Sequence, residues 1–340
     1  MIGALFDHLW QSTLCLLGVG LLALVLGNNR AATRYWLWLA ASLKFLVPFS
    51  LLTGLGALLP GLAPPPAAAP LLETLMPVAR PFTGELPLVQ APAMAGAPEW
   101  LLVLWGVGVG ATIAFWLVRG FDLQALARKG TPLSFAAPIP VLSSPRQLEP
   151  GLIGIVRPVL LLPQGIDTQL SPGELETILA HEICHFHRKD NLTAALHMLV
   201  TALFWFWPPV WWLGTRLVAE RERAVDEAVV SEGGDPRTYA DAILKVCKFY
   251  LHSPLACAAG VSGGALKLRM EAIMAEVLAH NLGPAKRALL AGAFALALAA
   301  PIAGGVLRPQ TADAMSADAV AAPAREFPTP RRASPVTSPC

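Results

Sequence analysis

The stretch that decides the fold is ILAHEICHFHRKDN, residues 178–191, together with LTAALHMLVTALFWFWPPVWWLG, residues 192–214, which follows it directly. The first part holds three histidines, a glutamate and a cysteine, all of which can bind or serve a metal ion. The second part is apolar enough to enter a membrane. The fold therefore depends on where this hydrophobic run takes the chain after the polar cluster.

The composition points to an integral membrane protein. Hydrophobic residues make up 55% of the 340-residue chain and charged residues only 14%, against about 25% in soluble domains. A net charge of +2 and the lack of a basic stripe argue against direct nucleic-acid binding. The five cysteines are scattered and form no C-x-x-C pair, which argues against a disulfide framework or a structural zinc knuckle.

Four segments reach membrane length, which takes roughly 20 mostly apolar residues. Basic residues flank them unevenly, and such residues prefer the cytoplasmic side. The resulting prediction is an α-helical multispanning membrane protein with four transmembrane helices, its N-terminus outside and a cytoplasmic α+β domain. Its parts are transmembrane helices 1 and 2 (1–59), an outer Pro/Ala-rich loop (60–98), transmembrane helix 3 (99–118), the cytoplasmic domain (119–287) with a membrane-associated hairpin (192–217), transmembrane helix 4 (288–307) and a disordered outer tail (308–340).

A β-rich segment leads into a helix that carries the polar cluster. Residues 134–165 form short aliphatic runs separated by Pro and Gly, as in short strands. Ser171, Pro172 and Glu174 then match a helix start with a capping box. On a helix from Pro172, His181 and His185 lie one turn apart on one face, where two imidazoles can share a metal.

The cluster matches the pattern HExxH, in which the glutamate serves as general base. Glu182 lies about 100° around the helix from His181 and can reach a water at the metal. Five residues are a short pattern, and a helical histidine is often merely structural. A capped helix, a preceding β-rich segment and a candidate third ligand raise the odds for one catalytic zinc ion.

The third ligand is predicted to come from LVAERERAVDEAVV, residues 217–230. His187 and Cys184 are angularly out of line with the two histidines, whereas Glu222 is a suitable ligand. Asp226, one turn further on, is placed to hydrogen-bond a ligand histidine. In isolation the same segment also reads as a solvated charged helix.

This ligand set constrains the hydrophobic run. A single crossing by residues 192–213 would put His185 and Glu222 on opposite sides of the membrane. Pro208 and Pro209 divide the run into two pieces too short to span, which favours a re-entrant or interfacial hairpin. Its tryptophans are expected at headgroup level, namely Trp205, Trp207, Trp211 and Trp212. The alternative is a buried hairpin in a soluble core.

The combined motifs resemble the BlaR/MecR-type antirepressor family of bacterial membrane zinc peptidases. The resemblance rests on LWQSTLCLL, RYWLWLAASLKFLVP, GIVRPVLLLPQGI, LAHEICHFHRKDN, FWFWPPVWWLGTRLVAERERAVDEAV and YADAILKV, and covers most of residues 1–307. It implies His181, His185 and Glu222 as zinc ligands, Glu182 as catalytic base and Asp226 as the aspartate that follows. Val225 stands where members commonly have cysteine.

By resemblance, the protein is a peptidase of the bacterial inner membrane that cleaves itself, a winged-helix transcriptional repressor, or both. The tail contains no S-x-x-K nucleophile, so a covalent β-lactam sensor is not expected. Two rival functions remain open. One is a general quality-control membrane protease, and the other is a non-enzymatic receptor with a structural zinc site, against which the intact Glu182 argues.

Three further features of the sequence suggest roles in substrate binding, catalysis or membrane insertion. The segment IGIVRPVLLLP, residues 153–163, is a candidate for binding substrate by strand addition. Tyr239 is a conceivable oxyanion stabiliser, although a structural role is favoured. Lys44, inside the second span, either has a function or snorkels to meet a partner.

Overall fold

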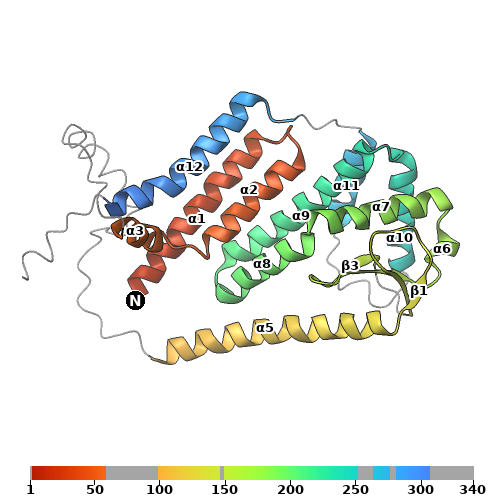
Figure 1. The fold of residues 1–340 in the computed structure, drawn as a ribbon, viewed down its shortest axis with the longest axis horizontal. Helices are drawn as coiled ribbons and strands as arrows, with labels where there is room; N and C mark the ends of the chain where they lie inside the picture. The colour runs from red at the N-terminus through yellow and green to blue at the C-terminus, as the bar shows by residue number, and fades with distance from the viewer. Residues whose placement is uncertain (1, 59–98, 146–148, 252–262, 276–280, 307–340) are drawn as a thin grey trace, which may run out of the picture.

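The computed structural model describes residues 2–58, 99–145, 149–251, 263–275 and 281–306 (Figure 1). The predicted outer loop and tail lie outside these residues, so their character stays a prediction. Within the described residues, helices account for most of the chain, and a small sheet lies at the end that carries α7 and α10 (Figure 1).

The first two predicted spans fall on three helices: α1 (Ile2–Val25), α2 (Ala31–Lys44) and α3 (Phe49–Ala57). The second span is broken, because α2 and α3 meet at an angle of 75°. Pro48 stands at the N-cap of α3 and has no N–H to continue the ladder of α2. Lys44 ends α2 with its ammonium group 2.8 Å from the Ser12 hydroxyl, so the intramembrane cation has a polar partner in α1.

The third span is longer than predicted and the fourth is not established. α5 (Glu99–Arg128) is one continuous helix that runs past residue 118 and reaches the sheet, where it packs on β2 and β3. The segment 288–307 falls largely within α12 (Pro284–Val306), which packs on α3. Among the described residues, two helices are long and apolar enough to cross a membrane, or three if the bent pair α2–α3 is one span.

The predicted β-rich segment is a four-stranded sheet of order β1-β2-β4-β3. Its strands are β1 (Thr131–Leu133), β2 (Val141–Ser144), β3 (Gly151–Ile153) and β4 (Val159–Pro163). The central pair β2–β4 is parallel and both edge pairs are antiparallel. Aliphatic residues of β4 lie in one core with α7, α9, α10 (Pro236–Leu251) and α11 (Gly263–Met274).

The predicted metal-binding helix is present as α7 (Pro172–Arg188), preceded by the short α6 (Ile166–Gln169). Both halves of the expected capping box form: the Ser171 side chain accepts from the Glu174 amide, and the Glu174 carboxylate accepts from the Ser171 amide at 2.8 Å. Two otherwise unpaired amides are thereby satisfied at the start of the helix. The helix and its start are therefore confirmed.

The hydrophobic run turns back on itself as α8 (Asp190–Leu203) and α9 (Pro208–Ser231), which pack together (Figure 1). The hairpin packs against α1 and α2 in a second core, to which Val200, Val210 and Leu213 contribute. The Trp207 indole donates to the Thr13 hydroxyl at 3.1 Å, so this tryptophan lies beside the middle of α1. The position of the hairpin relative to the membrane stays a prediction.

Candidate metal centre

α7 and α9 bring His181, His185 and Glu222 together. One ligand atom from each lies within 4.8 Å of the others. The two Nε2 atoms are 3.1 Å apart, and Glu222 Oε2 is 3.5 Å from that of His181 and 3.8 Å from that of His185. Zinc at its usual bond lengths of about 2.0–2.1 Å and tetrahedral angles separates ligand atoms by roughly 3.3 Å. The donor set therefore fits a zinc ion.

Hydrogen bonds on the far side of both rings fix their tautomers. His185 Nδ1 lies 2.7 Å from Asp190 Oδ2, a carboxylate oxygen that can only accept. His181 Nδ1 lies 2.7 Å from the Tyr239 hydroxyl, whose single proton goes to Asp226 Oδ1 at 2.6 Å. Both Nδ1 atoms must then donate. Each Nε2 then lies on the side of Glu222, so three metal-binding atoms converge on one point, as ligands do around a cation.

Asp226 lies near the site but is connected to His181 only through another side chain. Its Oδ1 is 3.7 Å from His181 Nδ1, and Tyr239 bridges the two. The predicted direct hydrogen bond is thus replaced by a relay through a fully buried phenol. Burial, then the neighbouring Asp226 charge, raises the pKa of Tyr239 well above its usual value, so the phenol keeps its proton. Both of its hydrogen bonds are internal, which favours the structural role over oxyanion stabilisation.

Arg269 of α11 is a site residue that the sequence reasoning missed. It donates to both Asp226 oxygens, at 2.7 and 2.8 Å, and its Nη1 lies 3.7 Å from Glu222 Oε2. Burial opposes the charge on the guanidinium, but Asp226 outweighs it and raises the pKa of Arg269 above its usual value. No motif links Arg269 to α7, and only the packing of α11 brings it there.

Asp190 is the second missed residue. It is the first residue of α8, where its carboxylate accepts from His185 Nδ1 and, at 3.2 Å, from Arg188 Nε. It is nearly fully buried. A sequence signal existed, since carboxylates commonly orient metal-binding histidines. However, Asp190 lies just beyond the end of α7, and helical spacing says nothing about a residue past the helix end.

Glu182 is buried on α7 between the two histidine positions in sequence. Its carboxylate makes no hydrogen bond with another side chain or amide in the described part of the chain. Burial raises its pKa above the usual value, opposed by the nearby histidines. A carboxyl group without structural partners beside a metal-binding cluster suits proton transfer.

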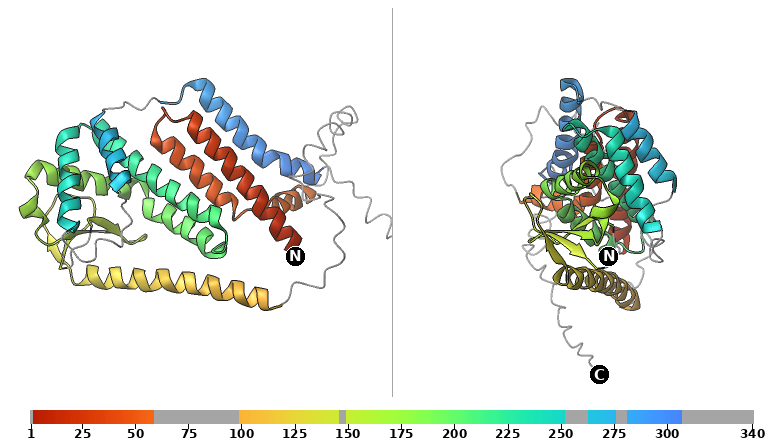
Figure 2. Two further views of the ribbon diagram at one scale, coloured as in Figure 1. Left: turned by 180° about the vertical axis from the view of Figure 1, so that it is seen from behind. Right: turned by 90° about the vertical axis from the view of Figure 1, so that its right-hand side faces the viewer.

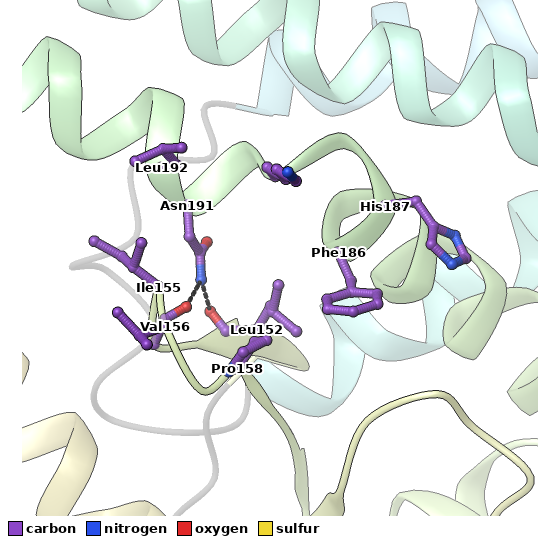
Figure 3. A pocket seen from close by; sticks show the side chains of 10 residues that line it. Leu152, Ile155, Val156, Pro158, Phe186, His187, Asn191 and Leu192 are labelled. Atoms are coloured by element: carbon purple, nitrogen blue, oxygen red, sulfur yellow. Dashed lines mark hydrogen bonds between the residues drawn. The ribbon is translucent and has the colours of Figure 1, made fainter.

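Cys184 and His187, which helical spacing excluded as ligands, lie apart from the cluster. Cys184 packs against the core formed by the sheet and α7, where burial raises the pKa of its thiol to about 11. His187 is exposed and lines a hollow between α7 and the β3–β4 turn, together with Phe186 (Figure 3). Neither belongs to the converging ligand set.

Two comparisons relate the chain to known proteins. The family described as BlaR1 peptidase M56 matches residues 5–273, which include both histidines and Glu222. The regulatory protein BlaR1 of Bacillus licheniformis is 30% identical over 163 residues, 47% of this chain but only 27% of that protein. The chain thus spans about a quarter of the relative's length. The extent of the family match shows that the chain belongs to the BlaR1 peptidase M56 family.

Proposed function

We propose that the protein is a zinc metalloendopeptidase that cleaves a protein substrate beside the cytoplasmic membrane. One observation carries this proposal, namely the convergence of two imidazoles and the Glu222 carboxylate on one point. A purely structural site would have no use for the buried Glu182 carboxylate nearby, which makes no hydrogen bond within the described residues, and this argues against a non-enzymatic receptor.

His181, His185 and Glu222 would hold one zinc ion, which would polarise a peptide carbonyl and let a water lose its proton near neutral pH. Glu182 would serve as the general base and then as the proton donor to the leaving amine. Asp190 and the Tyr239–Asp226–Arg269 relay hold the two imidazoles in the tautomer and orientation that zinc requires.

The substrate proposed is the chain itself, a winged-helix transcriptional repressor, or both. The BlaR1 relative carries the word "regulatory" in its description, and the aligned portion covers 47% of this chain. A dedicated signalling protease is therefore favoured over a general quality-control protease. The proposed setting is the bacterial inner membrane, with the N-terminus outside and four spans.

The substitution Glu182→Gln tests the mechanism, since it keeps the shape of the side chain but removes the base. We expect membranes of the variant to retain zinc while cleavage of the chain or of a repressor encoded beside it falls roughly 10²–10⁴-fold. Glu176→Gln, an exposed position on the same helix, is the matched control and should cleave normally. Zinc retention with undiminished cleavage by Glu182→Gln would refute the mechanism.

Reporter fusions test the topology. Alkaline phosphatase, which is active only outside the cytoplasm, should be active when fused in the 60–98 loop or after residue 340. A fluorescent protein that folds in the cytoplasm should remain dark at both positions. Phosphatase activity in the loop but not after residue 340 would rule out the fourth span.

A further inference from the structure

The turn between β3 and β4 presents apolar side chains to the outside. Ile155 is 53% exposed and Val156 is 90% exposed. The turn is rigidly built, because Gly154 adopts a φ of +95° and a Cβ there would lie 2.8 Å from the Arg157 carbonyl oxygen. Water-facing Ile and Val at the tip of a tight turn are unfavourable unless something covers them.

The junction of α7 and α8 completes this surface. Leu192 is 44% exposed and lies with Ile155 and Val156 on the border of one cavity of about 420 Å³ (Figure 3). Asn191 links the α7–α8 junction to the β3–β4 turn, because its side-chain amide donates to the carbonyls of Leu152 and Gly154 at 3.0 and 2.8 Å. The same bonds occupy carbonyls that strand addition at this end of β3 would need. A substrate strand is thus not the natural occupant here.

Contacts with α2 relate this surface to the expected membrane–water interface. Thr193, next to Leu192, hydrogen-bonds the Tyr35 hydroxyl, and the Arg188 guanidinium lies 5.1 Å from the centre of the Tyr35 ring. Tyr35 lies near the start of α2, which begins at Ala31, and Trp36 beside it is exposed. Arg30 precedes this helix. Basic and aromatic residues at the start of an apolar helix mark the membrane–water interface.

The charge of the surface suits one kind of partner. Arg157 and Lys189 are exposed, and among the described residues no carboxylate pairs with either of them. Asp190, which follows Lys189, is buried and bonded to His185 and Arg188. An exposed apolar turn flanked by cations is the pattern of a segment that enters an anionic lipid surface.

We propose that Ile155, Val156, Arg157, Lys189 and Leu192 form a foot that docks on anionic phospholipid headgroups at the leaflet approached by Tyr35. The apolar side chains enter the boundary of the acyl chains and the two cations contact phosphate groups. Because the foot joins the end of α7 to the sheet, docking holds the metal-binding helix at a set distance from the bilayer. This inference does not depend on peptidase activity.

The test uses the full chain in nanodiscs of phosphatidylcholine, with or without phosphatidylglycerol. A spin label is attached through Val156→Cys after the five native cysteines are replaced, and Glu176→Cys gives the control label. With phosphatidylglycerol, we expect the label at 156 to collide with oxygen dissolved in lipid and to be shielded from a water-soluble nickel chelate. The label at 176 should show the opposite behaviour.

Two substitutions test the charges without disturbing the backbone. Lys189 adopts a φ of 57°, which glycine tolerates, so Lys189→Gly keeps the end of α7 intact. Arg157→Gln keeps the length of its side chain. Each should lower the ratio of docked to undocked foot about fivefold in anionic nanodiscs, or about 1 kcal/mol per cation.

Three results would overturn the proposal. In the first, the label at 156 is as accessible to the nickel chelate as that at 176. In the second, lipid burial of the label is unchanged by removal of both charges or by omission of phosphatidylglycerol. In the third, shielding of the label is lost when labelled chain is diluted with unlabelled chain, which would identify a second copy as the partner.

Discussion

At the residue scale, the site depends on what lies behind each ligand. His181 and His185 are each held through Nδ1, one by Tyr239 and the other by Asp190. These bonds turn both Nε2 atoms toward Glu222, where Arg269 Nη2 also lies 3.5 Å from His181 Nε2. Ligand identity alone would leave the tautomers undetermined, because a histidine presents the correct nitrogen only when the other one is occupied.

Tyr239→Phe tests this conclusion at a single atom. The change removes one oxygen and leaves His181 Nδ1 without its buried partner, whereas Asp226 keeps its two bonds from Arg269. We expect the affinity for zinc to fall about 10–100-fold, measured by competition with a chelator. His187→Gln is the control, because His187 lies on the same helix as His181 but outside the ligand set, and it should bind zinc as wild type does. Equal affinity in both variants would show that the relay has no part in metal binding.

At the scale of elements, α9 serves two different neighbours. Glu222 and Asp226 face the metal centre, while Glu220 and Glu227 hold the start of α2. Glu220 accepts from Arg34 Nε at 2.9 Å, and Glu227 accepts from the Ala31 amide at 2.9 Å. A displacement of α2 would therefore be passed to the helix that supplies the third ligand.

Arg34→Met tests the strength of this connection. Arg34 is 6% exposed and also donates to backbone carbonyls before α2, so its loss leaves Glu220 buried without its main partner. We expect a loss of about 3–5 kcal/mol in unfolding free energy, measured by detergent titration.

The matched control is Arg223→Met, because Arg223 also meets Glu220 but is largely exposed and 3.8 Å away. Its loss should cost less than about 1 kcal/mol. Similar losses for the two variants would mean that the buried pair does not anchor α9 to α2.

At the scale of the whole molecule, the hairpin α8–α9 is the link between α5 on one side and α1 and α2 on the other (Figure 2). Its tip meets α5 through reciprocal hydrogen bonds. Trp105 donates to the Leu203 carbonyl at 2.9 Å, and Trp205 donates to the Trp105 carbonyl at 3.3 Å. The close approach requires a glycine, because a Cβ on Gly108 would lie 2.1 Å from the Trp205 ring.

Gly108→Ala should therefore force α5 away from the hairpin tip. We expect a loss of about 1–3 kcal/mol in unfolding free energy, as for other overpacked sites. Gly110→Ala is two residues along the same helix, where an added methyl group meets nothing within 4 Å, so it should have no cost. If Gly108→Ala is equally stable, then α5 does not rest on Trp205.

The sequence alone was sufficient for the local features of the site. The capping residues Ser171 and Glu174, the α7 helix and the i, i+4 spacing of its histidines all follow from interactions within a few residues, as does the break at Pro208 and Pro209. The membrane character followed from composition. The strands were foreseen as a group, but not their order, since pairing depends on contacts between separated segments.

Only the tertiary structure decided which distant groups complete the site. The approach of Glu222 depends on a hairpin that turns beside α1, and Arg269 arrives from a helix with no recognisable motif. Asp226 was expected to hydrogen-bond a histidine directly, but the Tyr239 hydroxyl lies between Asp226 and His181. The physical reason is the same in each case. Helical spacing specifies directions around one axis, whereas the distance between two helices is set by the side chains packed between them.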